Sequence, residues 1–97
     1  MFDAGLSLTM ADAPRALAEG LRALEAGETV FDLARVEALD SVAVALLLAW
    51  QRAARARGVE IKFHHLPPAL GSLAELYGVT ELLAVIPTAQ HQLHERH

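Results

Sequence analysis

The pair Asp40-Ser41 is the first place in this sequence where side-chain chemistry and position coincide. It separates a strand-like segment from an apolar run that begins at Val42. Asp and Ser are favoured at helix N-caps because their side-chain oxygens accept hydrogen bonds from the unpaired first backbone N–H groups. A serine hydroxyl in that place lies at the positive end of the helix dipole, which stabilises negative charge, including a phosphate. We therefore predict Asp40 and Ser41 as helix caps and Ser41 as a candidate phosphorylation site.

Histidines form two further groups. His64 and His65 are adjacent on a segment with strand alternation, so we expect their side chains to point to opposite faces and not to hold a metal together. A second group repeats every third residue, which could gather a metal on a helix: His91, His94 and His97. Metal ligands need fixed geometry and supporting hydrogen bonds, whereas we expect residues 87–97 to be a disordered tail. We therefore predict no metal site.

Catalytic patterns do not occur in the sequence. No serine has a neighbouring partner that suggests a triad, no glycine-rich phosphate loop is present, and no carboxylate pair is forced together. Asp32 and Arg35 follow a predicted strand and are interpreted as solvated side chains. We expect a protein that is not an enzyme and that uses no cofactor.

The composition narrows the class of protein. The 97 residues suffice for one domain, and a formal net charge of -4 gives no basic surface for nucleic acid or for an anionic membrane. Cysteine is absent, which excludes disulfides and thiolate zinc sites and fits a reducing cytosol. The longest apolar run, Val42 to Trp50, has 9 residues, whereas a membrane-spanning helix needs about 20. We expect a cytoplasmic module that neither binds nucleic acid nor inserts into a membrane.

Apolar periodicity and punctuating residues predict alternating strands and helices. The strands are expected at 6–10, 29–33 and 59–64, and the helices at 13–26, 41–57 and 68–77, with a last short turn at 80–83. This order implies an α/β fold with a parallel or mixed sheet and helices packed on it, in one domain over residues 1–86. Sites in such sheets gather outside the carboxyl ends of the strands, where Asp40-Ser41 is expected.

The helix that begins at Ser41 is apolar on both sides over its first two turns. At about 100° per residue, Gln51, Arg52 and Arg55 share one sector that must face water. The same sector, extended toward the amino end, adds four residues: Ser41, Val44, Ala45 and Leu48. Either a neighbouring segment of the chain covers this sector or a partner protein does, as the 54% apolar content also suggests. In the second case these four residues form the contact surface and the two arginines its basic rim.

Four segments of the chain resemble the STAS domain, the fold of anti-sigma factor antagonists, and within it the MlaB-like proteins. They are Phe31–Val36, Leu39-Asp40-Ser41, Ala45–Leu48 and Leu73–Val79, in matching order across residues 6 to 85. The resemblance implies a STAS-like fold and a non-catalytic accessory subunit. Such a subunit binds and supports the ATP-binding subunit of a phospholipid-transporting ABC complex, which serves outer-membrane lipid asymmetry in Gram-negative bacteria. It also implies a peripheral location at the inner membrane through that partner, with Ser41 in the contact.

The chain departs from the STAS pattern at two places. Many STAS domains have a glycine shortly after the serine, whereas Val42-Ala43 makes this corner bulkier. Relatives also carry a further strand before the one at 6–10, for which only residues 1–5 are available. We expect an abbreviated edge strand, which could pair with a second copy to give a homodimer.

Two other functions stay open. An anti-sigma factor antagonist would be switched by phosphorylation at Ser41, because the added negative charge changes binding. A lipid or small-ligand binder would need a pocket that 97 residues around a packed sheet can hardly provide. The accessory subunit is the function that we expect in preference to either.

Overall fold

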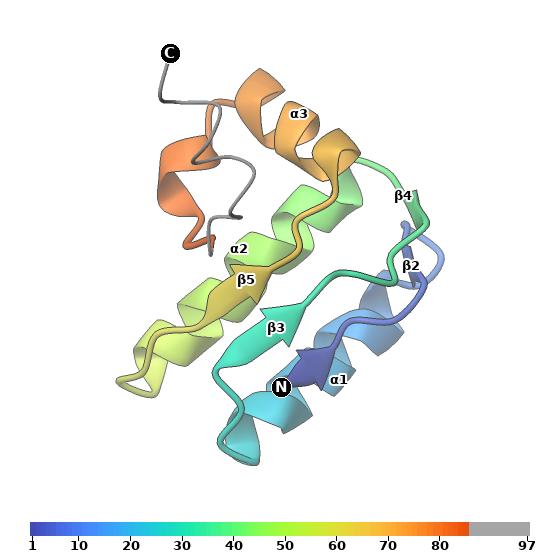
Figure 1. Cartoon of the computed structure of the whole chain (residues 1–97). Coiled ribbons are helices and arrows are strands. Elements are labelled where there is room, and N and C mark those ends of the chain that lie inside the picture. Colours follow the sequence, from blue (N-terminus) through green and yellow to red (C-terminus); the bar gives the residue numbers. More distant parts are fainter. Residues whose placement is uncertain (86–97) are drawn as a thin grey trace.

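The helices form where local sequence signals place them. The computed structural model describes residues 1–85 and contains helices α1 (Ala13–Glu25), α2 (Val42–Ala56) and α3 (Pro68–Leu76), then a 3₁₀ turn, η1 (Thr80–Leu82) (Figure 1). Proline occupies the first turn of α1 and of α3, where a missing N–H costs nothing. Left-handed glycines, Gly27 and Gly58, follow α1 and α2. The predicted tail at 87–97 lies outside the described residues.

The strands are shorter than predicted and all run parallel. Strands β1 (Phe2–Asp3), β3 (Val30–Asp32) and β5 (Lys62–His64) form the main sheet in the order β1-β3-β5, and β2 (Ser7–Leu8) pairs with β4 (Ala38–Leu39) as a separate ribbon. The α/β fold with parallel strands is confirmed, as is the abbreviated strand at its amino end. The strand predicted at 6–10 shrinks to two residues and leaves the main sheet. Its partner β4 lies far along the chain, and periodicity does not reveal such pairings.

One face of the main sheet carries the core. Phe31 and Phe63 are fully buried on neighbouring strands, and Trp50 of α2 packs edge-on against Phe31 with ring centroids 5.3 Å apart. Side chains alternate across a strand, so Asp32 and His64, which follow the two phenylalanines, point to the opposite face. Figure 1 views that opposite face: α1 and α2 lie behind the sheet, and none of the helices within residues 1–85 crosses in front of it.

Helices α1 and α2 approach each other closely at Gly20. The indole N–H of Trp50 donates a hydrogen bond of 3.4 Å to the carbonyl of Leu17. A Cβ built on Gly20 would overlap the indole ring, so this position accepts no side chain without a shift of the helices. Trp50 thus contacts both α1 and the sheet, so its side of α2 faces the core.

Candidate docking surface along helix α2

Asp40 and Ser41, at the corner before α2, have different roles. The carboxylate of Asp40 accepts hydrogen bonds from the backbone N–H of Val42 at 2.9 Å and of Met10 at 3.0 Å. It therefore satisfies a free donor of the helix and ties α2 to the loop before α1. Ser41 already has helical backbone angles, its side chain makes no capping bond, and it is exposed. Of the two predicted caps, the capping bond belongs to Asp40 alone, and the hydroxyl of Ser41 faces solvent.

The predicted outward sector of α2 is only partly exposed. Ser41, Ala45, Arg52 and Arg55 are exposed, and Leu48 is half-buried. Val44 was expected in the same sector but is only 5% exposed and belongs to the core. Helix α2 contacts α1, β2 and α3, so the chain itself covers this part of the sector. Burial of Val44 within the chain accounts for part of the sector, and the cover of the exposed part by a partner protein stays a prediction.

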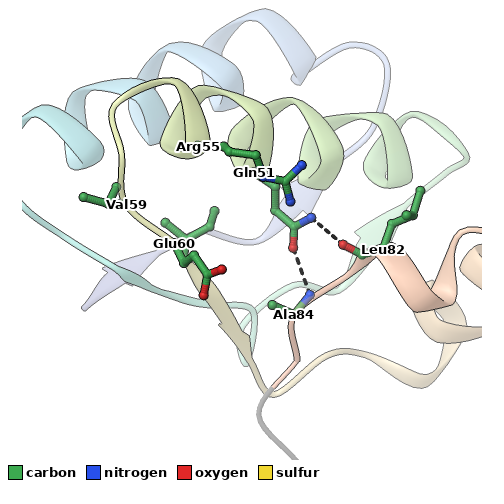
Figure 2. Close-up of a pocket in the computed structure, with 7 residues that line it drawn as sticks. Gln51, Arg55, Val59, Glu60, Leu82 and Ala84 are labelled. Atoms are coloured by element: carbon green, nitrogen blue, oxygen red, sulfur yellow. Dashed lines mark hydrogen bonds between the residues drawn. The ribbon is translucent and has the colours of Figure 1, made fainter.

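Gln51 corrects the sequence interpretation most clearly. It was expected to face water, yet it is only 9% exposed. Figure 2 shows its amide, which donates to the carbonyl of Leu82 at 2.6 Å and accepts from the N–H of Ala84 at 2.9 Å. The N–H of Phe63 in β5 in turn donates to the carbonyl of Ala84 at 2.8 Å. Gln51 thus clamps the segment after η1 between α2 and the sheet. A glutamine that shares a helical sector with Arg52 and Arg55 carries no sequence signal for this role.

An open hollow lies between α2 and η1. Its volume is about 360 Å³, and its lining is partly apolar with two arginines and one carboxylate: Leu48, Gln51, Arg52, Arg55, Glu81 and Leu82. Leu82 is 59% exposed although it is a large apolar residue. A smaller recess of about 70 Å³ adjoins it on the other side of Gln51 and Arg55, toward Val59 and Glu60 (Figure 2). The hollow combines apolar side chains with a rim of net positive charge.

Two more large apolar side chains are exposed near η1. Leu76 is 74% exposed and Tyr77 is 52% exposed at the end of α3. Leu76 belongs to the apolar stripe predicted for this helix, but only Leu70 and Ala74 of α3 are buried. Helical spacing alone does not tell which of several apolar positions faces the core, because it fixes angles around the helix axis and not the position of the neighbouring helix.

A second group of side chains meets at the carboxyl ends of β3 and β5. The sequence interpretation separated His64 from His65, but His65 has a positive φ of 59°, and the two imidazole rings stack with centroids 3.9 Å apart. Asp32 was interpreted as solvated, yet its side chain is 19% exposed, and its Oδ1 accepts a hydrogen bond from Nδ1 of His65 at 3.0 Å. The residue types were visible in the sequence, whereas the turn that joins them was not.

Ion pairs tie the first strand and the first loop to the rest of the chain. Arg35 is exposed, as interpreted from the sequence, and it also contacts Asp3 of β1 at 2.8 Å. The backbone N–H of Gly5 and the guanidinium of Arg35 hold the pKa of Asp3 below its ordinary value. Both partners are exposed, so this pair adds little to stability.

The comparisons with known proteins agree with this architecture. No curated protein matches the chain. Within residues 1–85, no helix combines the length and the apolarity that a membrane crossing requires. A family model described as "Mlab, STAS domain" matches residues 5–86, which spans all three helices and every strand except β1. With that match, the parallel α/β fold and the Asp40-Ser41 corner before α2, the chain belongs to the STAS-domain family of MlaB type.

Proposed function

We propose that this chain is a non-catalytic accessory subunit that binds the ATP-binding subunit of a phospholipid-transporting ABC complex and supports its activity. Membership of the MlaB-type STAS family supports this class of function. The proposal places the protein in the cytoplasm, peripheral to the inner membrane through its partner.

The contact with the ATP-binding subunit is made by a docking surface on α2 and η1. We define it as Ser41, Ala45, Leu48, Arg52, Arg55 and Leu82, the exposed or half-exposed residues around the hollow and along the outer side of α2. Val44 is excluded from it because it is buried. Leu82 is added because the structure exposes it beside Leu48.

One observation carries the proposal: Leu48 and Leu82, from two different elements, line one open hollow that Arg52 and Arg55 flank. Specific protein interfaces have an apolar centre within a polar rim, and arginine is enriched in them. The rim arginines favour an acidic counterpart on the ATP-binding subunit, because complementary charge steers association and fixes orientation.

The test measures binding of the purified ATP-binding subunit to variants of this chain. Leu82→Glu and Arg52→Glu are each expected to raise the dissociation constant at least about tenfold, since each reverses the chemistry of the docking surface. Leu21→Glu is the matched control, because Leu21 is 36% exposed and lies on α1, outside the docking surface. Circular dichroism and thermal unfolding of all three variants should match the parent chain. Undiminished binding by both surface variants would count decisively against this docking surface.

The exposed hydroxyl of Ser41 favours a second candidate function, a phospho-regulated antagonist in a partner-switching pathway. The hydroxyl makes no capping bond and lies at the N-cap position of α2, where the helix dipole stabilises a phosphate. Incubation with a cognate anti-sigma kinase and ATP, followed by intact-mass measurement, should then show one added phosphate that Ser41→Ala removes. An unchanged mass would exclude this function.

A further inference from the structure

Three side chains with metal-binding atoms meet on the open face of the main sheet, at its carboxyl edge. Asp32 ends β3 and His64 ends β5, and the two are direct partners in the parallel register. His65 follows with a φ of 59°, and this left-handed turn returns its ring to the side of His64. The ligand atoms of the three residues all lie within 4.8 Å of one another.

These spacings approach those around a bound cation. Oδ1 of Asp32 and Nδ1 of His65 are 3.0 Å apart. Two ligand atoms that each lie 2.0–2.1 Å from a tetrahedral zinc ion are about 3.3 Å apart. The distance between these two atoms therefore has to increase only slightly for a cation to replace the proton between the carboxylate and the imidazole. A ring nitrogen of His64 lies within 4.8 Å of both atoms, so this ring has to turn out of its stack on His65 to supply the third ligand.

Neighbouring groups hold two of the ligands in place. The N–H of Ala34 donates to Oδ1 of Asp32 at 3.2 Å, and both hydrogen bonds to this carboxylate use the same oxygen, which leaves Oδ2 open among residues 1–85. A non-glycine residue with positive φ costs free energy, and the contacts of His65 with Asp32 and His64 offset that cost. Hydrogen bonds of this kind orient ligands around metal ions.

The setting also gives a cation access and selects its type. An open hollow of about 370 Å³ borders His65, with an otherwise apolar lining that leaves room for water: Leu33, Ala34, Val36, Leu66, Pro67 and Pro68. Two imidazoles with one carboxylate suit zinc and its first-row neighbours, whereas magnesium and calcium prefer oxygen ligands throughout. We propose that Asp32, His64 and His65 bind a divalent first-row transition-metal cation such as zinc.

The test uses the full chain with the other three histidines replaced, H91Q/H94Q/H97Q, so that only this pair of imidazoles remains. Calorimetric titration with zinc chloride should show one saturable site per chain, and magnesium chloride should show none. On the same background, D32N or H65N should weaken zinc binding at least about tenfold. Asparagine is chosen at position 65 because it tolerates the left-handed conformation.

The matched control is D3N on the same background. Asp3 is the register partner of Asp32 on β1, but it is not part of the ligand group, so zinc binding should be unchanged. In NMR spectra of the H91Q/H94Q/H97Q protein, zinc should shift the imidazole signals of both His64 and His65. The same signals should stay in place when D32N is added to this background. Thermal unfolding without zinc checks that each variant is folded. Zinc binding that survives D32N and H65N, or that vanishes once the other three histidines are replaced, would overturn the proposal.

Discussion

Single residues at the start of α2 have separate tasks. Asp40 holds the corner together through two backbone donors, while the hydroxyl of its neighbour Ser41 is left to solvent. This division matters for the proposed function. A substitution at a contact residue tests partner binding alone only if that residue does not stabilise the fold. Ser41 meets that condition and Asp40 does not.

Replacement of Asp40 by Ala should destabilise the folded chain by about 1–2 kcal/mol, because the first turn of α2 loses its capping carboxylate. Replacement of Ser41 by Ala should change the free energy of unfolding by less than about 0.5 kcal/mol, since this exposed side chain makes no capping bond. Urea unfolding of both variants measures the difference. Equal losses in the two variants would contradict the assignment of the cap to Asp40.

Replacement of Gln51 by Ala should cost about 1–3 kcal/mol, because the carbonyl of Leu82 and the N–H of Ala84 both lose their partner. Arg52→Ala, at the next position, removes an exposed side chain and should cost less than about 0.5 kcal/mol. Urea unfolding again gives the comparison. If the two variants are equally stable, the clamp contributes nothing to the fold.

Features of single residues that depend only on residues nearby in the sequence could be predicted. A capping carboxylate next to a helix start is such a feature, and Asp40 was predicted as one. The burial of Gln51 depends on a segment 31 residues away, and the meeting of Asp32 with His65 depends on strand pairing and on one unusual backbone angle. Neither the burial of Gln51 nor the contact between Asp32 and His65 can be predicted from the local sequence pattern.

At the scale of elements, the contact between α1 and α2 depends on Gly20, although glycine is unfavourable within a helix. Gly20→Ala gains about 1 kcal/mol of helix propensity, but its methyl group overlaps the buried ring of Trp50. Overpacking of a rigid core costs about 1–3 kcal/mol, so the variant should be net destabilised. Gly71→Ala in α3 is the control: its Cβ would be 3.8 Å from Leu66, an ordinary contact, so it should be stabilised. Thermal unfolding that ranks the two variants the other way would contradict the close packing.

The loop between β2 and α1 makes stability depend on pH. The hydroxyl of Ser7, then the guanidinium of Arg15 and the hydroxyl of Thr9, hold the pKa of Asp12 below its ordinary value of 3.8. The folded pKa is therefore lower than the unfolded pKa, so the stabilising contribution is complete above the unfolded value and is lost as the pH falls through the folded one. Asp12→Asn should be less stable than the parent at neutral pH, and the gap should close on acidification. Urea midpoints across an acid series measure that gap, and a constant gap would exclude the mechanism.

The elements also show which parts of a fold are local. The bounds of all three helices agree with prediction to within one residue at each end, because caps, prolines and terminal glycines act over a few positions. The strands agree less well, since β2 and β4 exist only through each other. The docking surface shares this limit: exposure along α2 was predicted for Ser41, Ala45 and the arginines. The burial of Val44 and the exposure of Leu82 depend on how the elements pack together.

For the whole molecule, the free edge of β1 bears on the number of chains in solution. The main sheet has β1 at one end, and this strand comprises only Phe2–Asp3. Short, charged edges discourage pairing, whereas unpaired backbone groups invite it. The homodimer through this edge stays a prediction, and sedimentation velocity measures it. A dimer that is unaffected by Asp3→Pro, which removes the backbone donor that β1 directs away from β3, would have to form elsewhere.

The hydrogen bonds that Gln51 makes to the segment after η1 allow amide exchange to report whether the hollow between α2 and η1 is covered. The amide proton of Ala84 exchanges with solvent only when its bond to Gln51 opens, and Gln51 also lines the hollow with Leu48 and Leu82. A partner that binds only the closed form stabilises it by about 2.7 kcal/mol at a concentration one hundred times its dissociation constant, which slows exchange about one hundredfold. Deuterium uptake at this one amide therefore reports when the hollow is covered, whatever protein covers it.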